Sequence, residues 1–172
     1  CLDVYEDSNY VLSVHHYEPV HFVFNLVSGL SYPVKAPEGR WDKSVMRRNL
    51  SRHKKVSRTY DLPVFVGEFG VNARYGLFGE DRWLKDVLKC FEELGFHWTY
   101  WTYKAVKNGT FPDGIYSYAD NPPWVNRAGP LTGWDTYRHQ WPARQRAMTE
   151  SWHTDRFQVN GHILSELQNA LR

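Results

Sequence analysis

The chain has 172 residues, which is enough for one domain with a hydrophobic core of its own. A net charge of +2 with 23% charged residues argues against a nucleic-acid binder and against a specialist for acidic substrates. No apolar run is long enough to span a bilayer, so we expect no membrane partner. The chain begins at Cys1 without a Met or an apolar leader; we interpret Cys1 as a cut end, which leaves localisation open, an extracellular one included.

Three short apolar runs predict buried strands, at residues 10–14, 63–66 and 97–101. Amphipathic patterns predict helices near residues 42–58, 81–94 and 157–171. Glu80 and Asp81 place negative charge at the start of the second helix, and Gly95 marks its end. The chain therefore alternates strand and helix three times, which predicts an α/β fold with parallel strands.

Two long segments, at residues 19–41 and 102–156, follow the first and third strands. Loops of this length without elements of their own are usually functional or disordered. The second segment is rich in Pro, Gly, Trp and Tyr, which favours an ordered loop at the edge of a cleft. Aromatic residues make up 16% of the chain, with eight Trp, and such rings suit the apolar faces of sugars as well as a protein core.

A basic stretch falls within the first predicted helix. We interpret it as a solvated helix face rather than a nucleic-acid site, because aromatic residues do not alternate with the charges. We expect no metal site and no cofactor. Cys1 and Cys90 lack metal-ligand spacing, and His15 and His16, as consecutive strand residues, point in opposite directions.

Glu68 is the strongest catalytic candidate because it lies at the end of the second predicted strand. Alternation along this strand places Val64, Val66 and Glu68 on one face. Glycines on both sides, Gly67 and Gly70, leave room for a substrate to approach the backbone. The alternative is a structural Glu at a strand end that pairs with an arginine.

Alternation also places Ser13, His15 and Tyr17 on one face of the first strand, directed toward the same rim as Glu68. On the third strand, Trp101 ends a face shared with His97 and Thr99. Trp101 is a candidate for stacking on a sugar, although a core position is the ordinary role of a single Trp.

Three motifs together resemble strands six, seven and eight of glycoside hydrolase family 5. They are Asp7–Pro19, with His15-His16-Tyr17-Glu18-Pro19 at its end, Pro63–Gly70, with Gly67-Glu68-Phe69-Gly70, and Trp98–Lys104. The resemblance implies that the chain is part of a (β/α)8 barrel of the TIM type and covers roughly strands six to eight with their helices. Residues 1–172 would then form the carboxyl-terminal part of one catalytic domain.

The resemblance also implies site residues and an activity. Glu68 falls on the family's nucleophile, His15 and Tyr17 on its strand-six pattern, and Trp101 on its strand-eight Trp. Tyr103, Trp124 and Trp134 are further candidates for the wall of the cleft. The implied function is that of a retaining glycosidase, an endo-β-1,4-glucanase or β-mannanase, acting on a β-linked oligo- or polysaccharide.

The family's acid/base Glu belongs to an Asn-Glu pair on strand four, and no such pair occurs in this chain. A complete barrel takes about 250 residues. We therefore expect the amino-terminal half of the barrel to come from another chain, or the chain to self-associate through its open sheet edges. The alternative is a non-catalytic carbohydrate-binding or assembly fragment that lacks the acid/base Glu.

Overall fold

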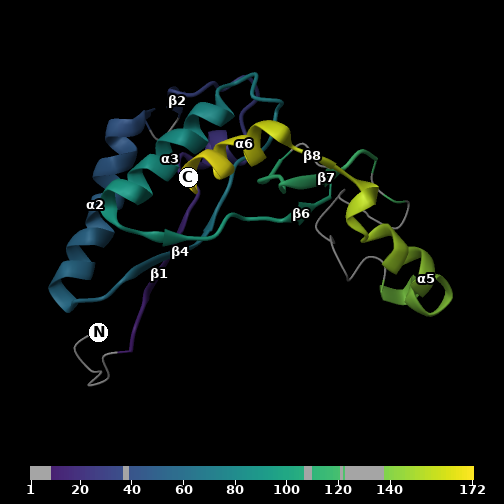
Figure 1. The fold of residues 1–172 in the computed structure, drawn as a ribbon. Helices are drawn as coiled ribbons and strands as arrows, with labels where there is room; N and C mark the ends of the chain where they lie inside the picture. The colour runs from purple at the N-terminus through teal and green to yellow at the C-terminus, as the bar shows by residue number, and fades with distance from the viewer. Residues whose placement is uncertain (1–8, 37–38, 107–109, 121, 123–137) are drawn as a thin grey trace.

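A computed structural model describes residues 9–36, 39–106, 110–120, 122 and 138–172 (Figure 1). Its strands fall into three small sheets. The strands are β1 (Leu12–His16), β2 (Val34–Ala36), β3 (Gly39–Trp41), β4 (Val64–Phe69), β5 (His97–Trp98), β6 (Lys104–Ala105), β7 (Tyr116–Tyr118) and β8 (Phe157–Val159). The helices are α1 (Val20–Val23), α2 (Lys43–Tyr60), α3 (Glu80–Leu94), α5 (Trp141–Ser151) and α6 (Gly161–Ala170).

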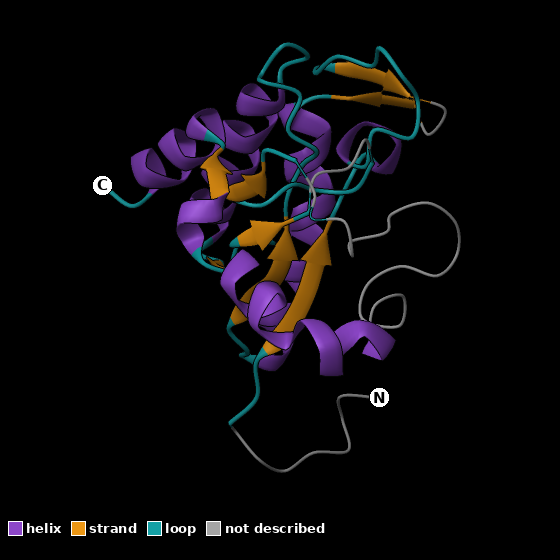
Figure 2. Ribbon diagram, turned by 90° about the vertical axis from the view of Figure 1, so that its right-hand side faces the viewer, coloured by secondary structure: helices purple, strands orange, loops and turns teal. Residues whose placement is uncertain are grey.

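The central sheet has the strand order β1-β4-β5, and both pairs are parallel. In Figure 2 the two long arrows at the centre, β1 and β4, point the same way. These are the three strands predicted from the sequence, with β1 two residues later than expected and β5 shortened to His97–Trp98. The strand-helix alternation of the sequence therefore did identify parallel pairing.

Helices α2, α3 and α6 cover one face of this sheet (Figure 1). Helices α2 and α3 start and end close to the predicted limits. Asp42 caps α2 by accepting hydrogen bonds from the backbone N–H groups of Ser44 and Val45. Gly95 ends α3 in the left-handed conformation, with a φ of 67°, which glycine adopts without steric cost.

The core lies between these helices and the sheet. Val64 and Val66 of β4 are buried against it, as are Trp83 and Phe91 of α3. The opposite face of the sheet is polar and open, because Ser13 and His15 of β1 are exposed there. One face of the sheet is thus packed and the other is available to a site.

The pairing of β1 with β4 contains an irregularity that redirects Glu68. Val14 pairs with Val66 and His15 pairs with Glu68, so Gly67 is an extra residue in β4. Such a bulge bends the strand and re-aims the side chains that follow it. The predicted shared face of Val64, Val66 and Glu68 is therefore wrong: both valines face the core, whereas Glu68 lies beside His15.

The long segments after β1 and β5 carry elements of their own. Residues 19–41 contain α1 and the antiparallel pair β2-β3. Beyond β5, the strands β6, β7 and β8 form a small sheet, and α5 lies past it (Figure 1). Helix α5 escaped prediction because its charged and apolar residues follow no clear helical period; only Met148 is buried. The predicted last helix is also shorter, since residues 157–159 form β8.

Within the residues that the structure describes, no helix combines the length and the apolar character that crossing a membrane requires.

His16 lies in the core behind β1. Its ring stacks on Trp83 with centroids 6.2 Å apart and meets the edge of Phe91. Its Nε2 atom is buried without a hydrogen-bond partner. Burial, reinforced by the nearby His53, lowers the pKa of His16 from 6.5 to about 4. The imidazole is therefore neutral in the folded chain at pH values where it would be charged in the unfolded one.

This shift predicts a loss of stability in acid. Because the unfolded chain binds the proton more readily between pH 6.5 and pH 4, the free energy of unfolding should fall by about 3 kcal/mol as the pH drops through this range. Substitution of His16→Phe, which keeps a ring in place, should remove most of this slope. The measurement is denaturant unfolding at pH 7, 5.5 and 4.5, with His97→Gln on the exposed face as control. Equal slopes in wild type and His16→Phe would contradict this assignment.

Candidate active site

Glu68 lies at the carboxyl end of β4, where two residues from β1 and the segment after it contact its carboxylate. The Tyr17 hydroxyl donates a hydrogen bond of 2.9 Å to Oε2 of Glu68. His15 Nδ1 lies 3.5 Å from the same oxygen. The other carboxylate oxygen, Oε1, has no hydrogen-bond partner among the described residues. One oxygen is thus held in place while the other remains available.

The Glu68 side chain is 31% exposed and has no arginine partner in the described part of the chain. This excludes the structural alternative of a buried ion pair at a strand end, as far as the structure describes the chain. Burial, followed by the hydrogen bond and the negative charge of Glu68, raises the pKa of Tyr17 well above its usual value. Tyr17 therefore keeps its proton and remains a donor to the carboxylate across the physiological pH range.

A cavity of about 730 Å³ opens in front of Glu68. Four of the described residues that line it are aromatic. Among them, Phe24 packs edge-on against Tyr17, with centroids 5.3 Å apart, and against Phe111 at 5.5 Å. Trp101 lines the cavity and is 50% exposed. A cavity of this size, with one carboxylate and several rings, suits a ligand with apolar faces and polar edges.

The position of Trp101 is set by β4 and by a glycine. The Trp101 backbone N–H donates to the carbonyl oxygen of Phe69 at 2.8 Å. The peptide bond from Trp101 to Thr102 is cis. A Cβ atom at Gly70 would collide with the Trp101 carbonyl oxygen. Gly70 therefore makes room for the backbone of this protein rather than for a substrate, which corrects the sequence interpretation.

Thr99, which follows β5, supports the bulge from the edge of β4 opposite to β1. Its hydroxyl donates to the Gly67 carbonyl at 2.7 Å, and its backbone N–H donates to the Val66 carbonyl at 3.0 Å. These two bonds satisfy carbonyl groups on either side of the irregularity. Thr99 shares a predicted face with Trp101, but its contribution is to the backbone of β4.

The structure brings some predicted site residues together and not others. His15, Tyr17, Glu68 and Trp101 converge on one end of the sheet. Tyr103 is 55% exposed and packs on Tyr116, and it is not among the residues that line the cavity. Trp124 and Trp134 lie outside the described residues.

Sequence analysis missed the wall residues Phe24 and Phe111 and the basic residue Lys104, which line the same cavity. All three lie in segments without a regular period, so no pattern marked them. The ammonium group of Lys104 donates to the Trp152 carbonyl at 2.7 Å, which links the cavity wall to the end of α5. In the sequence, only their aromatic character could have marked Phe24 and Phe111 as residues of the cavity wall.

The sequence of the chain matches a known protein family. The family model described as Cellulase (glycosyl hydrolase family 5) matches residues 3–107, which is more than half of the chain and includes β1, β4, β5 and Glu68. The chain belongs to glycosyl hydrolase family 5. Among curated proteins, none matches the chain significantly.

Several solved structures share the fold of this chain. The chain is similar to a hyperthermophilic endo-β-1,4-glucanase solved in complex with substrate, with a TM-score of 0.52, 22% identity, and coverage of 76% of this chain and 38% of that one. A structure named endoglucanase has a TM-score of 0.51 and 26% identity, and the match covers 66% of this chain and 36% of that one. A structure named only as a glycoside hydrolase has a TM-score of 0.59 and 18% identity, and the match covers 93% of this chain and 41% of that one.

The chain therefore spans only 36–41% of the length of these structures. Its parallel strands and covering helices correspond to part of a family 5 TIM barrel. In such barrels, active sites lie at the carboxyl ends of the strands, where Glu68 and Trp101 are found here.

The two glycines of β4 give a matched pair of variants for the packing around Glu68. Gly70→Ala should destabilise the fold by about 1–3 kcal/mol, because the new methyl group meets the Trp101 carbonyl. Gly67→Ala should cost less, because its Cβ would meet Ser13, Phe65 and His15 at ordinary contact distances of 3.4–3.6 Å. Denaturant unfolding of the two variants checks this order. If Gly67→Ala were the more damaging change, the assigned role of Gly70 would be wrong.

Proposed function

We propose that this chain is the carboxyl-terminal part of a retaining glycoside hydrolase that cleaves β-1,4-linked glucan, with Glu68 as the nucleophile. The observation that carries the proposal is the hydrogen-bonded carboxylate at the end of β4 beside an aromatic cavity. The family, and the endoglucanase names of similar structures, support a glucan as the substrate. Mannan is the alternative substrate, and the test below compares it with glucan.

The proposed chemistry assigns one role to each group. An oxygen of Glu68 attacks the anomeric carbon, the bond from this carbon to the leaving sugar's oxygen breaks, and that oxygen takes a proton from an acid. Water then hydrolyses the glycosyl ester, which regenerates the Glu68 carboxylate and the acid. Tyr17, by donating to Oε2, holds the carboxylate in one orientation.

His15 and Trp101 are proposed to bind the sugar. The exposed His15 ring lies next to Glu68, where it can contact sugar hydroxyls. The half-exposed Trp101 ring offers a stacking face for the sugar that is cleaved. Holding the sugar against Trp101 would fix the distance over which the Glu68 oxygen attacks.

The acid that protonates the leaving oxygen is proposed to come from the amino-terminal half of the barrel. Among the described residues that line the cavity, Glu68 is the single carboxylate, whereas a retaining mechanism needs two carboxyl groups about 5–5.5 Å apart. In the described residues, β1 and β5 each pair on one side only. Strands of another half-barrel chain, or of a second copy of this chain, would cover these edges.

The test measures turnover of an aryl β-cellobioside by the chain alone and by the chain assembled with a family 5 amino-terminal half. We expect the assembly to turn over the substrate and the isolated chain not to do so. In the assembly, Glu68→Gln should lower turnover by several orders of magnitude and retain sugar binding. Tyr17→Phe should lower turnover less, because it removes one hydrogen bond and keeps the nucleophile. Aryl β-mannobioside in parallel reports substrate preference.

Azide distinguishes a nucleophile from an acid/base residue. In a Glu68→Ala assembly, azide should occupy the space of the lost carboxylate and restore turnover, and a single displacement should give the α-glycosyl azide. A β-glycosyl azide would instead assign Glu68 as the acid/base residue. Sugar binding without turnover in any assembly would favour the alternative function, a non-catalytic carbohydrate-binding or assembly fragment.

A further inference from the structure

Helix α2 carries a concentration of positive charge that the proposed active site does not use. Over residues Lys43–Tyr60 it contains no acidic residue. Its seven cations are Lys43, Arg47, Arg48, Arg52, Lys54, Lys55 and Arg58. This leaves 14 cations against 19 carboxylates in the rest of the chain. The small net charge of the whole chain therefore hides a strongly basic helix on an otherwise acidic protein.

Most of these cations have no ionic partner in the described part of the chain. Lys43 and Arg47 both contact Glu93 of α3, at 3.4 Å and 3.1 Å. The other five make no ion pair with a residue that the structure describes. Charges of one sign along a helix repel each other by a few tenths of a kcal/mol per pair, so an uncompensated row carries a cost to stability.

Several of these side chains line a groove of about 390 Å³ between α2 and the end of α3. Its cations are Arg47, Lys54, Lys55 and Arg58, and Leu94 of α3 also lines it. The hydroxyl groups of Ser51 and Thr59 donate to carbonyls within α2, so they are not free as donors to a ligand. The groups left to bind a ligand are therefore ammonium and guanidinium groups.

Helix α2 also contains a histidine, His53. Burial, and then the charge of Arg52, lowers the pKa of His53. His53 thus stays neutral near pH 7 and adds no charge to the groove.

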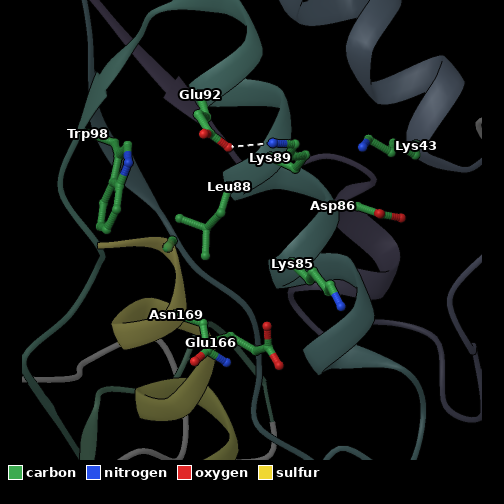
Figure 3. Close-up of a pocket in the computed structure, with 10 residues that line it drawn as sticks. Lys43, Lys85, Asp86, Leu88, Lys89, Glu92, Trp98, Glu166 and Asn169 are labelled. Atoms are coloured by element: carbon green, nitrogen blue, oxygen red, sulfur yellow. Dashed lines mark hydrogen bonds and ion pairs between the residues drawn. The ribbon is translucent and has the colours of Figure 1, made fainter. Parts of the chain in front are cut away.

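The groove differs from a similar cavity on the neighbouring helices. Between α3 and α6, a cavity of about 450 Å³ also contains lysines, but Asp86, Glu92 and Glu166 line it with them (Figure 3). There, Lys89 pairs with Glu92 at 2.7 Å. Charges of both signs neutralise each other in that cavity, whereas none of the described residues that line the groove on α2 is a carboxylate.

The groove also lies away from the proposed active site. It is formed by side chains of α2 between Arg47 and Thr59 and by Leu94 at the end of α3, and these helices lead into the starts of β4 and β5. Glu68 and Trp101 lie at the opposite, carboxyl ends of these strands. A ligand in this groove would leave the Glu68 cavity open.

We propose that this groove binds an acidic polysaccharide, whose ring carboxylates pair with the cations of α2. Cations at positions 47, 54 and 58 recur after one or two turns, each of about 5.4 Å, along a helix about 27 Å long. A polyuronate carries one carboxylate on every sugar ring and so presents charges at a similarly regular spacing. The site would anchor the protein to an anionic polymer independently of the chemistry at Glu68.

Two observations favour a polysaccharide over a nucleic acid. Within the described part of the chain no aromatic residue lines the groove, whereas single-stranded nucleic acids are bound by stacking of bases on aromatic rings. The chain also belongs to glycosyl hydrolase family 5, and a glycan polymer agrees with the function proposed above, on which this second point rests.

The test measures binding of sodium polygalacturonate to the chain at low and high salt. The variant Lys54→Gln/Lys55→Gln/Arg58→Gln should bind at least about tenfold more weakly, because it removes three ion pairs. The matched control, Arg82→Gln/Lys85→Gln/Lys89→Gln, removes three exposed cations from α3 and should bind as wild type does. Glu68→Gln should also bind as wild type does, which separates this site from the proposed active site.

Two further probes test the nature of the ligand on the unmodified chain. Carboxyl-reduced polygalacturonate keeps the sugar backbone without its charge and should not bind, and binding of the native polymer should weaken as salt rises. The proposal is overturned if polygalacturonate does not bind at low salt, if both triple variants lose affinity equally, or if the reduced polymer binds as well. Tighter binding of duplex DNA than of polygalacturonate would overturn it in favour of a nucleic-acid surface.

Discussion

One extra residue in β4 determines where the site can form. Because Gly67 has no partner of its own in β1, the strand changes the direction of its side chains between Val66 and Glu68. Without this bulge, alternation would turn Glu68 toward the same core as Val64 and Val66, where an unpaired carboxylate is costly. With it, the carboxylate meets Tyr17 and His15 on the open face of the sheet.

The surroundings of the bulge hold it in this shape. Thr99 donates two hydrogen bonds to carbonyls beside it, and the Trp101 N–H bonds to Phe69 just after it. Behind the sheet, Phe69 packs edge-on against Phe91, Trp98 and Tyr100. The rigid core on one face thus fixes the position of the carboxylate on the other, as a preorganised site requires.

Much of this architecture could be predicted from the sequence because it rests on local patterns. Apolar runs gave the three parallel strands, helical periods gave α2 and α3, and Gly95 marked a helix end. The bulge could not be predicted, because its two-to-one pairing depends on how β1 and β4 meet rather than on the order of residues in either strand. The face assigned to Glu68 from strict alternation was wrong for this reason, although its place at the strand end was found.

The same limit applies to the segments after the strands. Helix α5 and the small sheet β6-β7-β8 were expected to be loop, because short strands and a helix with one buried residue leave little periodic signal. Phe24 and Phe111 entered the cavity wall through contacts between distant segments, and Gly70 acquired its role from the Trp101 backbone. The basic character of α2 was visible in the sequence, but the groove it forms with α3 was not.

The central claim is that Glu68 forms a covalent bond with the sugar, and trapping that bond tests it most directly. An activated 2-deoxy-2-fluoro-β-cellobioside should inactivate the assembled barrel. Fluorine at C2 slows both formation and hydrolysis of the glycosyl ester, whereas the activated leaving group speeds its formation, so the ester accumulates. Peptide mass spectrometry should then find the fluorinated sugar on the peptide that contains Glu68. A label on any other residue of the assembly, or labelling that persists in Glu68→Gln, would contradict the account.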